Sequence, residues 1–232
     1  LLADWALACA SFDLRVEDVA RENLEKIASR WPGENKVYCP FFDPEDMYDE
    51  HERLPRKFDI EFVERGTGPD AHVVQRLRGV YIGDRLTDNS NEPDDYRFHD
   101  VFHLAYIAYL GWSPVVRGLL KRKRKSKRSV DENEDGARAM IIEEGIATWI
   151  FNHAKPRDLY ADVTEGKLEY GLLKQIQSMV EGYEVHRCKL WQWELAILNG
   201  FNVFRLLRQH RGGIVTVDMN KHTLTFTAFP KT

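Results

Sequence analysis

The spacing of apolar residues changes from one segment to the next, and this constrains the fold of the chain more than any other sequence feature. Apolar residues recur every three to four positions where a helix with one buried face is expected. The segments with this spacing are residues 1–12, 16–30, 96–111, 134–154, 168–187 and 190–210. In 58–82 and 214–229 apolar and polar residues alternate on both sides of a turn, which predicts two β-hairpins, the first with 72–82 as its second strand. The predicted fold is α+β and mainly α: a helical bundle with a small antiparallel sheet from two β-hairpins.

Composition indicates a protein that is stabilised by its own apolar core. The chain has 232 residues, 43% of them hydrophobic, which is enough to bury a core without covalent cross-links. Cys9, Cys39 and Cys188 lie far apart, which argues against a disulfide framework and excludes a structural zinc ribbon. The sequence has no apolar run of membrane-spanning length and no signal-peptide pattern, so we expect a cytoplasmic protein without membrane contact.

The sequence divides into three parts. It begins at Leu1, without methionine and inside an apolar run, so we expect it to belong to a longer protein. Residues 1–32 form two terminal helices. Residues 33–57 contain three of the prolines and are predicted to be a linker loop. Residues 58–232 are expected to form the α+β domain.

Two histidines carry the clearest chemical signal. His99 and His103 are four residues apart in the predicted helix 96–111, so their rings share one face and can hold one divalent metal ion. The residue after the first histidine is Asp100, whereas the HExxH pattern of zinc proteases has glutamate there. We take Asp100 as a candidate catalytic residue. The alternative is that both histidines are ordinary polar residues at the start of a helix.

Two acidic residues in the predicted helix 134–154 strengthen the metal hypothesis. Glu144 lies on the apolar stripe of this helix and Glu143 borders it, and an unpaired buried carboxylate is costly. Glu144 is therefore predicted to be a metal ligand and Glu143 a catalytic residue. The alternative is a buried salt bridge to Arg97 or Arg138.

Weaker candidates lie on the last two predicted helices. His186 and Glu194 both fall within apolar stripes. Each is either a further metal ligand or a group that orients one. The alternative is a polar residue whose hydrogen bonds are satisfied within the core. Two imidazoles with one or two carboxylates would leave coordination positions open for water and substrate. Such ligands suit Mn, Fe, Zn or Ni better than Mg.

A block of basic residues, 121–128, connects the histidine helix to the glutamate helix. Lysine and arginine at one end of a bundle attract phosphate oxygens. The candidate substrate-binding residues are Arg97, Arg138, Lys121, Arg122 and Lys123. The alternatives are a solvated loop and a nucleic-acid contact, although the net charge of −4 and the lack of aromatic residues in the block weaken the latter.

Two regions resemble a known family. The run from Asp18 to Lys26, read as DVAxxNLxK and followed by Arg30-Trp31-Pro32, resembles the end of a MazG-like nucleoside triphosphate pyrophosphohydrolase domain. The rest is similar to the C-terminal extension of some MazG-like proteins, most clearly in three stretches. These are Tyr96 to Leu104, Leu110 to Pro114 and Glu134 to Gly145.

The resemblance implies Mg- or Mn-dependent hydrolysis of nucleoside triphosphates to the monophosphate and pyrophosphate, by a homo-oligomer. The catalytic ExxE and ExxD carboxylates of the family would lie before Leu1, so no residue of this chain takes their role. The sequence therefore predicts a metal-dependent nucleotide hydrolase with a His/Glu site of its own between bundle helices. The alternatives are a binding module for nucleotide, nucleic acid or a partner beside a MazG-type catalytic domain, and a metal-dependent nuclease or phosphoesterase.

Overall fold

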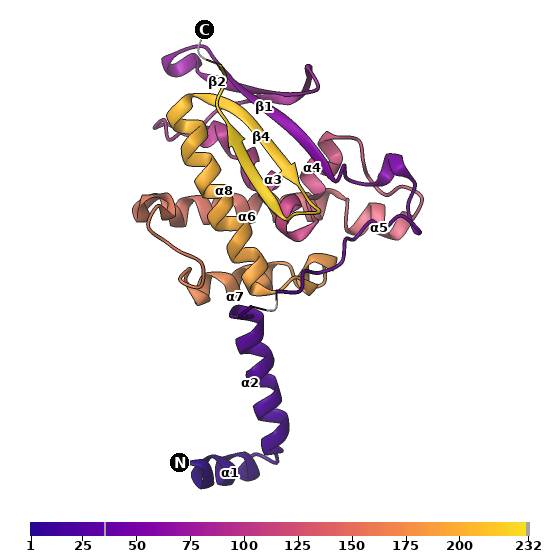
Figure 1. Cartoon of the computed structure of the whole chain (residues 1–232), viewed down its shortest axis with the longest axis vertical. Coiled ribbons are helices and arrows are strands. Elements are labelled where there is room, and N and C mark those ends of the chain that lie inside the picture. The colour runs from indigo at the N-terminus through magenta and orange to yellow at the C-terminus, as the bar shows by residue number, and fades with distance from the viewer. Residues whose placement is uncertain (35, 231–232) are drawn as a thin grey trace.

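The computed structural model describes residues 1–34 and 36–230 and confirms an α+β fold that is mainly α (Figure 1). Its α-helices are α1 (Leu2–Ser11), α2 (Val16–Arg30), α3 (Asp100–Leu110), α4 (Pro114–Leu119), α5 (Arg128–Asn133), α6 (Ala137–Ala154), α7 (Tyr170–Met179) and α8 (Leu190–His210). Short 3-10 helices are η1 (Glu50–Glu52), η2 (Gly68–Asp70), η3 (Tyr96–Phe98), η4 (Lys155–Tyr160) and η5 (Glu184–Arg187). The strands are β1 (Lys57–Arg65), β2 (His72–Leu77), β3 (Val80–Leu86), β4 (Gly212–Asp218) and β5 (Thr223–Thr227).

The strands form one antiparallel sheet in the order β3-β2-β1-β4-β5. Pairing of β1 with β4, which sets Phe58 opposite Val217, joins the two ends of the domain into one sheet. The prediction of a single strand over 72–82 is wrong. The chain reverses at Arg78 and Gly79, both at positive φ (51° and 78°), and this tight turn separates β2 from β3.

The core lies between this sheet and two helices. Helices α3 and α8 pack on each other, and both contact β4 and β5. Gly200 of α8 lets the helices approach closely, since a Cβ there would lie 3.2 Å from the Cβ of Ala105 in α3. Residues Val101 to Leu110 of α3 are all buried. Any polar side chain on α3 must therefore find a partner inside the protein.

Two predicted helices are shorter than expected. Helix 134–154 begins only at Ala137, because Gly136 has an extended backbone (φ −85°, ψ 176°) and serves as the N-cap. Only glycine fits there, since a Cβ would collide with the carbonyl oxygen of Glu132. Helix 168–187 ends at Met179, and the chain then turns through Gly182 at φ 87° before η5. The residues beyond Met179 are therefore not on a continuous helical face.

The segment before the sheet has little regular structure but packs into the body. Phe42, Tyr48 and Leu54 are buried. The buried carboxylate of Asp43 accepts hydrogen bonds from the Leu54 amide and from Arg117, both at 2.7 Å. This segment is thus held by side chains as a part of the domain core.

Helices α1 and α2 project from the body (Figure 1). Arg30, at the end of α2, fixes their attachment: it is buried, pairs with Glu194 of α8 and donates to the carbonyl of Leu168 at 2.8 Å. Large apolar side chains on these two helices remain exposed, among them Leu2, Leu7, Leu24 and Ile27. Among the described residues, no helix is both long enough and apolar enough to cross a membrane.

Candidate metal centre

His99 stands immediately before α3, with one ring nitrogen already engaged. Its Nδ1 donates to the carbonyl of Tyr96 at 2.9 Å, and its ring stacks on the Tyr96 ring with the centroids 4.3 Å apart. A neutral imidazole whose Nδ1 carries the proton presents its Nε2 lone pair for other contacts. The structure thus orients His99 Nε2 as a potential ligand.

His103, one turn later on α3, is fully buried. Its Nδ1 donates to Glu143 Oε1 of α6 at 2.8 Å. Its Nε2 is buried as well, and within the described residues it makes no hydrogen bond. A buried polar atom without a partner is rare in folded proteins and calls for a physical explanation.

Ligand atoms from three residues gather at this nitrogen. One atom each from His99, Asp100 and His103 lies within 4.8 Å of the others, which is compact enough to hold a metal ion. Asp100 Oδ1 lies 3.1 Å from His99 Nε2. Glu144 Oε2 is 3.4 Å from His103 Nε2 and 3.9 Å from His99 Nε2. The structure therefore has a possible metal site of two imidazoles and one or two carboxylates.

Glu143 lies behind the cluster with both carboxylate oxygens engaged. Oε1 accepts from His103 and from the Ser113 hydroxyl at 2.6 Å, and Oε2 accepts from the Val115 amide at 2.9 Å. It is fully buried, whereas the Glu144 side chain is 43% exposed. The expectation that Glu144 occupies the buried stripe and Glu143 its border is thus reversed. The buried face of α6 runs through Ala139, Glu143, Ile146, Ala147 and Ile150.

Sequence reasoning missed two residues that hold these groups. Gln75 of β2 donates to Asp100 Oδ2 at 2.5 Å, and no local pattern marks it because it comes from a distant strand. Ser113 accepts from the Val116 amide at 3.0 Å as the N-cap of α4, while its hydroxyl donates to Glu143. The Ser-Pro pair at a helix start signals the cap but not the second contact.

In this cluster, the charges of neighbouring groups shift the pKa values of His103 and Glu144 against the effect of burial. Burial by itself lowers the pKa of His103, but Glu143 and Glu144 outweigh it and hold this pKa well above the ordinary 6.5. Burial raises the pKa of Glu144, but the neighbouring His103 and His99 bring it below the usual value. Near neutral pH the metal-free cluster therefore pairs a charged His103 with an ionised Glu144.

We expect metal binding near neutral pH to release about one proton, because His103 must lose its proton before Nε2 can bind a cation. Metal affinity should fall as the pH falls, by about tenfold per pH unit below the pKa of His103. Calorimetric titration with Zn²⁺ or Mn²⁺ in buffers of different ionisation enthalpy measures the proton release. A metal affinity that does not change with pH would contradict this assignment.

The free energy of unfolding of the metal-free protein should instead fall as the pH rises. Folding raises the pKa of His103, so the stabilisation by this residue is fully present below about pH 6.5, the pKa of the unfolded chain. This stabilisation is lost as the pH rises through the pKa of the folded state.

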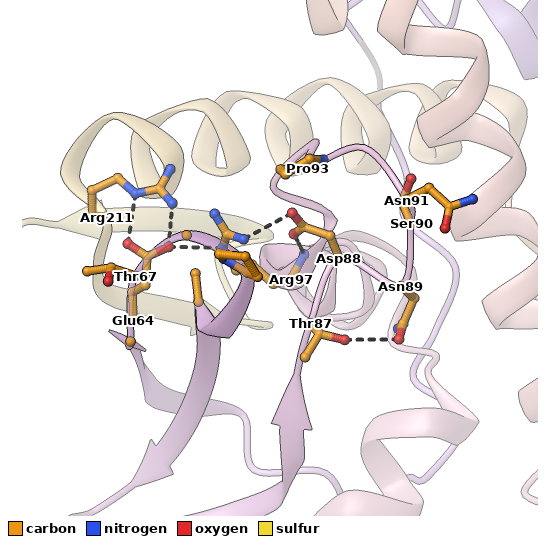
Figure 2. Close-up of a pocket in the computed structure, with 14 residues that line it drawn as sticks. Glu64, Thr67, Thr87, Asp88, Asn89, Ser90, Asn91, Pro93, Arg97 and Arg211 are labelled. Atoms are coloured by element: carbon orange, nitrogen blue, oxygen red, sulfur yellow. Dashed lines mark hydrogen bonds and ion pairs between the residues drawn. The ribbon is translucent and has the colours of Figure 1, made fainter.

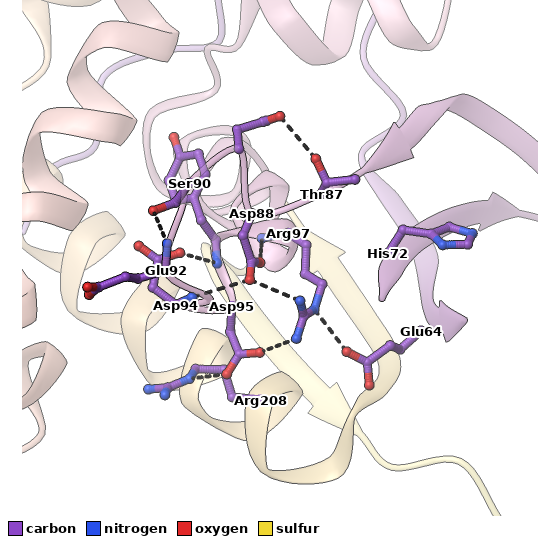
Figure 3. A network of polar contacts seen from close by, with 12 residues as sticks. Glu64, His72, Thr87, Asp88, Ser90, Glu92, Asp94, Asp95, Arg97 and Arg208 are labelled. Atoms are coloured by element: carbon purple, nitrogen blue, oxygen red, sulfur yellow. Dashed lines mark hydrogen bonds and ion pairs between the residues drawn. The ribbon is translucent and has the colours of Figure 1, made fainter. Parts of the chain in front are cut away.

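Arg97, a predicted substrate-binding residue, is buried in a network of carboxylates (Figure 3). Its guanidinium donates to Glu64 at 2.9 Å, to Asp88 at 3.0 Å and to Asp95 at 2.6 Å. Asp88 also accepts from the Arg97 amide at 3.1 Å. These contacts fix the loop that leads to His99, and they occupy the charge of Arg97 with structural partners.

The same network borders a cavity of about 860 Å³ between the 66–71 turn and the 87–93 loop (Figure 2). Arg211, at the end of α8, pairs with Glu64 and with Asp95 there. Arg208 donates to Asp95 at 3.0 Å. Among the described residues, the cations and anions that line this cavity thus pair with one another and leave no uncompensated charge for a ligand.

The remaining predicted substrate-binding residues lie elsewhere. Arg138 is exposed in the first turn of α6. Arg122 donates to the Glu50 carbonyl at 2.7 Å. Lys121 and Lys123 line a separate cavity between α4 and α6, described below.

The two weaker candidates lie away from the cluster. Glu194 is bound by Arg30 and accepts from the Leu168 amide at 2.8 Å, so its buried charge is satisfied by the α2 attachment. His186 is exposed in η5, because α7 ends before it. The structure gives neither side chain a contact with a histidine of the cluster.

Fold and site together define a class: an α+β domain that gathers imidazole and carboxylate groups from two helices at one potential metal site. Residues 37–230 match the family described as the MazG C-terminal domain. Because this match covers most of the chain, the chain belongs to that family, as the resemblance implied. No curated protein and no solved structure gives a significant match.

Proposed function

We propose that the chain is a metal-dependent hydrolase of phosphate esters, similar in reaction to a nucleoside triphosphate pyrophosphohydrolase, with its metal held by His99, Asp100 and His103. The observation that carries the proposal is His103 Nε2, a fully buried nitrogen that makes no hydrogen bond within the described residues and faces a second imidazole and two carboxylates. Its nearest acceptor is Glu144 Oε2 at 3.4 Å, which is long for a hydrogen bond. A cation bound there would give this nitrogen a direct partner.

The contacts around the histidines fit a metal site. Metal-bound histidines usually donate the other ring N–H to a carboxylate or a backbone carbonyl, and here Glu143 and the Tyr96 carbonyl accept these bonds. Asp100 is held by Gln75. This nitrogen and oxygen donor set favours Mn²⁺, Fe²⁺, Zn²⁺ or Ni²⁺ over the Mg²⁺ typical of the family resemblance.

When bound, a divalent ion at this site supplies charge for a phosphoryl oxygen and makes water more acidic. Glu144 is the carboxylate beside the cluster that is open to solvent, and its lowered pKa keeps it ionised near neutral pH. We therefore assign proton acceptance from the attacking water to Glu144 and metal ligation to Asp100, the reverse of the roles predicted from sequence. Glu143 is reassigned from catalytic to positioning residue, because both its oxygens hold other groups.

The alternative is a binding module, without catalysis, for nucleotide, nucleic acid or a partner beside a MazG-type catalytic domain. With either function we propose that the chain forms a homo-oligomer. The exposed apolar side chains of α1 and α2 support this, because they could form the contact surface between subunits.

The test is metal removal followed by product analysis. The purified chain is analysed for metals, treated with a chelator, reloaded with Mn²⁺, Zn²⁺ or Mg²⁺ and incubated with nucleoside triphosphates. We expect chelation to lower hydrolysis by about 100-fold or more, and Mn²⁺ or Zn²⁺ to restore it better than Mg²⁺. The expected products are the monophosphate and pyrophosphate.

Two outcomes would overturn the hydrolase proposal, and a third would change the substrate that it assigns. Hydrolysis that persists after complete metal removal would exclude a metal-dependent reaction at this site. Metal and nucleotide binding without turnover would favour the binding module, and cleaved nucleic-acid strands would assign the reaction to a nuclease.

A further inference from the structure

The basic loop 121–125 is built with two faces. Arg124 points into the protein: it is fully buried, with bonds to Asp135 at 2.7 Å and to Glu184 at 2.6 Å. Arg122 is half-buried and donates to the Glu50 carbonyl at the surface. The buried guanidinium of Arg117 donates to the Arg122 carbonyl at 3.1 Å. This loop is therefore held in place by ion pairs and hydrogen bonds.

The three lysines of this loop lie on its other face. Lys121, Lys123 and Lys125 line one cavity of about 470 Å³, together with Gly118 and Met140. Within the described residues, Lys121 and Lys125 form no ion pair, and Lys123 lies 3.9 Å from one carboxylate oxygen of Asp131. The cavity thus carries excess positive charge that the protein itself does not neutralise.

This lysine cavity lies next to the metal centre on the same side of α6. Met140 of the cavity and Glu144 of the cluster are one helical turn apart, about 6 Å along the axis. Helix α4 supplies Gly118 to the cavity, and its Val115 amide donates to Glu143 at 2.9 Å. The two sites therefore share helix α6, and α4 lines the cavity while also contacting Glu143 behind the metal centre.

We propose that Lys121, Lys123 and Lys125 form a phosphate subsite that binds the far end of an oligophosphate chain, while the metal centre acts on a phosphoryl group nearer the other end. The phosphate subsite rests on the proposed hydrolase function. It specifies the substrates of that hydrolase as esters of di- or triphosphate. Lysine ammonium groups are compact charges that bind phosphate well. A single phosphate is too small to reach both sites across a helical turn.

The composition of the cavity favours a small phosphate compound over a nucleic acid. Its lining has no aromatic side chain. Proteins that bind single-stranded nucleic acid stack bases on such side chains. The lysines therefore provide charge for phosphate without a surface for successive bases.

The experiment measures binding of inorganic tripolyphosphate and orthophosphate to the chelator-treated chain by calorimetry. The test variant is Lys121→Gln combined with Lys125→Gln. The control combines Lys167→Gln with Lys221→Gln, two exposed lysines elsewhere, and changes the net charge equally. We expect the test variant to bind tripolyphosphate about tenfold more weakly or worse, and the control to bind like the wild type. Orthophosphate should bind more weakly than tripolyphosphate to the wild type. Thermal melting verifies that both variants fold.

Equal losses in test and control variants would overturn the subsite, since they would reflect only net charge. A single-stranded RNA that displaces tripolyphosphate and binds the lysines more tightly would also overturn it. Loss of tripolyphosphate binding in the test variant, in a chain that proves to bind no metal, would support the subsite and overturn the hydrolase proposal. The two proposals can therefore fail separately.

Discussion

Replacing His103 by alanine is expected to lower the affinity for Zn²⁺ or Mn²⁺ by more than about 100-fold and to reduce nucleotide hydrolysis to the level of the metal-depleted protein. Removal of a group that merely orients a ligand typically costs 10–100-fold in metal affinity, and His103 is proposed to be a ligand itself. Its Nε2 is the one buried side-chain nitrogen of the cluster that lacks a hydrogen bond within the described residues. Metal analysis, calorimetry and product assays measure the effect.

Two further variants separate metal loss from unfolding. His103→Ala leaves Glu143 buried without one of its donors and is expected to be destabilised as well. His99→Ala removes a ligand whose ring donates to the Tyr96 carbonyl and to no buried carboxylate, so it should lose metal with a smaller loss of stability. His51→Ala, at an exposed histidine of η1, is the matched control. Wild-type metal content in a folded His103→Ala protein would refute the site.

Replacing Arg124 by methionine is expected to lower the free energy of unfolding by about 3–5 kcal/mol, because it leaves the carboxylate of Asp135 buried without its main counter-charge. The same guanidinium also binds Glu184 and the Phe42 carbonyl. Arg124 thus connects the basic loop, η5 and the segment before the sheet. Urea unfolding followed by circular dichroism measures the change.

The control for this prediction is Arg128→Met. Arg128 pairs with Glu132 at 2.7 Å, but both side chains are largely exposed, so the expected loss is below about 1 kcal/mol. Similar losses in the two variants would mean that Arg124 contributes no more than a surface ion pair. Arg124→Lys should restore only part of the stability, because lysine cannot bind two carboxylates with a planar fork.

Local patterns in the sequence predicted most of the secondary structure. The spacing of apolar residues placed the helices now labelled α2, α3 and α8 nearly at their observed bounds. The errors fall where a single residue interrupts a pattern. The extended backbone at Gly136 delays the start of α6, and Arg78 with Gly79 reverses a stretch that alternates like one strand. In both cases the backbone conformation at one or two positions outweighs the preference of a longer segment.

The candidate site was predictable only in part. The four-residue spacing of His99 and His103 is a local property, and the structure keeps both rings at one cluster. Which of Glu143 and Glu144 is buried could not be determined from the local sequence. Adjacent residues on a helix face directions 100° apart, and only the packing of α3 and α4 against α6 selects which of the two is enclosed.

The sequence by itself determined what depends on near neighbours: the type of each element, the shared face of the two histidines and the concentration of basic charge in 121–128. Only the tertiary structure decided which partners meet. It brought Gln75 to Asp100, paired Arg97 with three carboxylates and buried Arg124 of the basic loop, while the lysines beside Arg124 line a cavity. The physical reason is that a charge or hydrogen-bonding group is satisfied by whatever packing brings near it, and residues far apart in the chain meet only when the core forms.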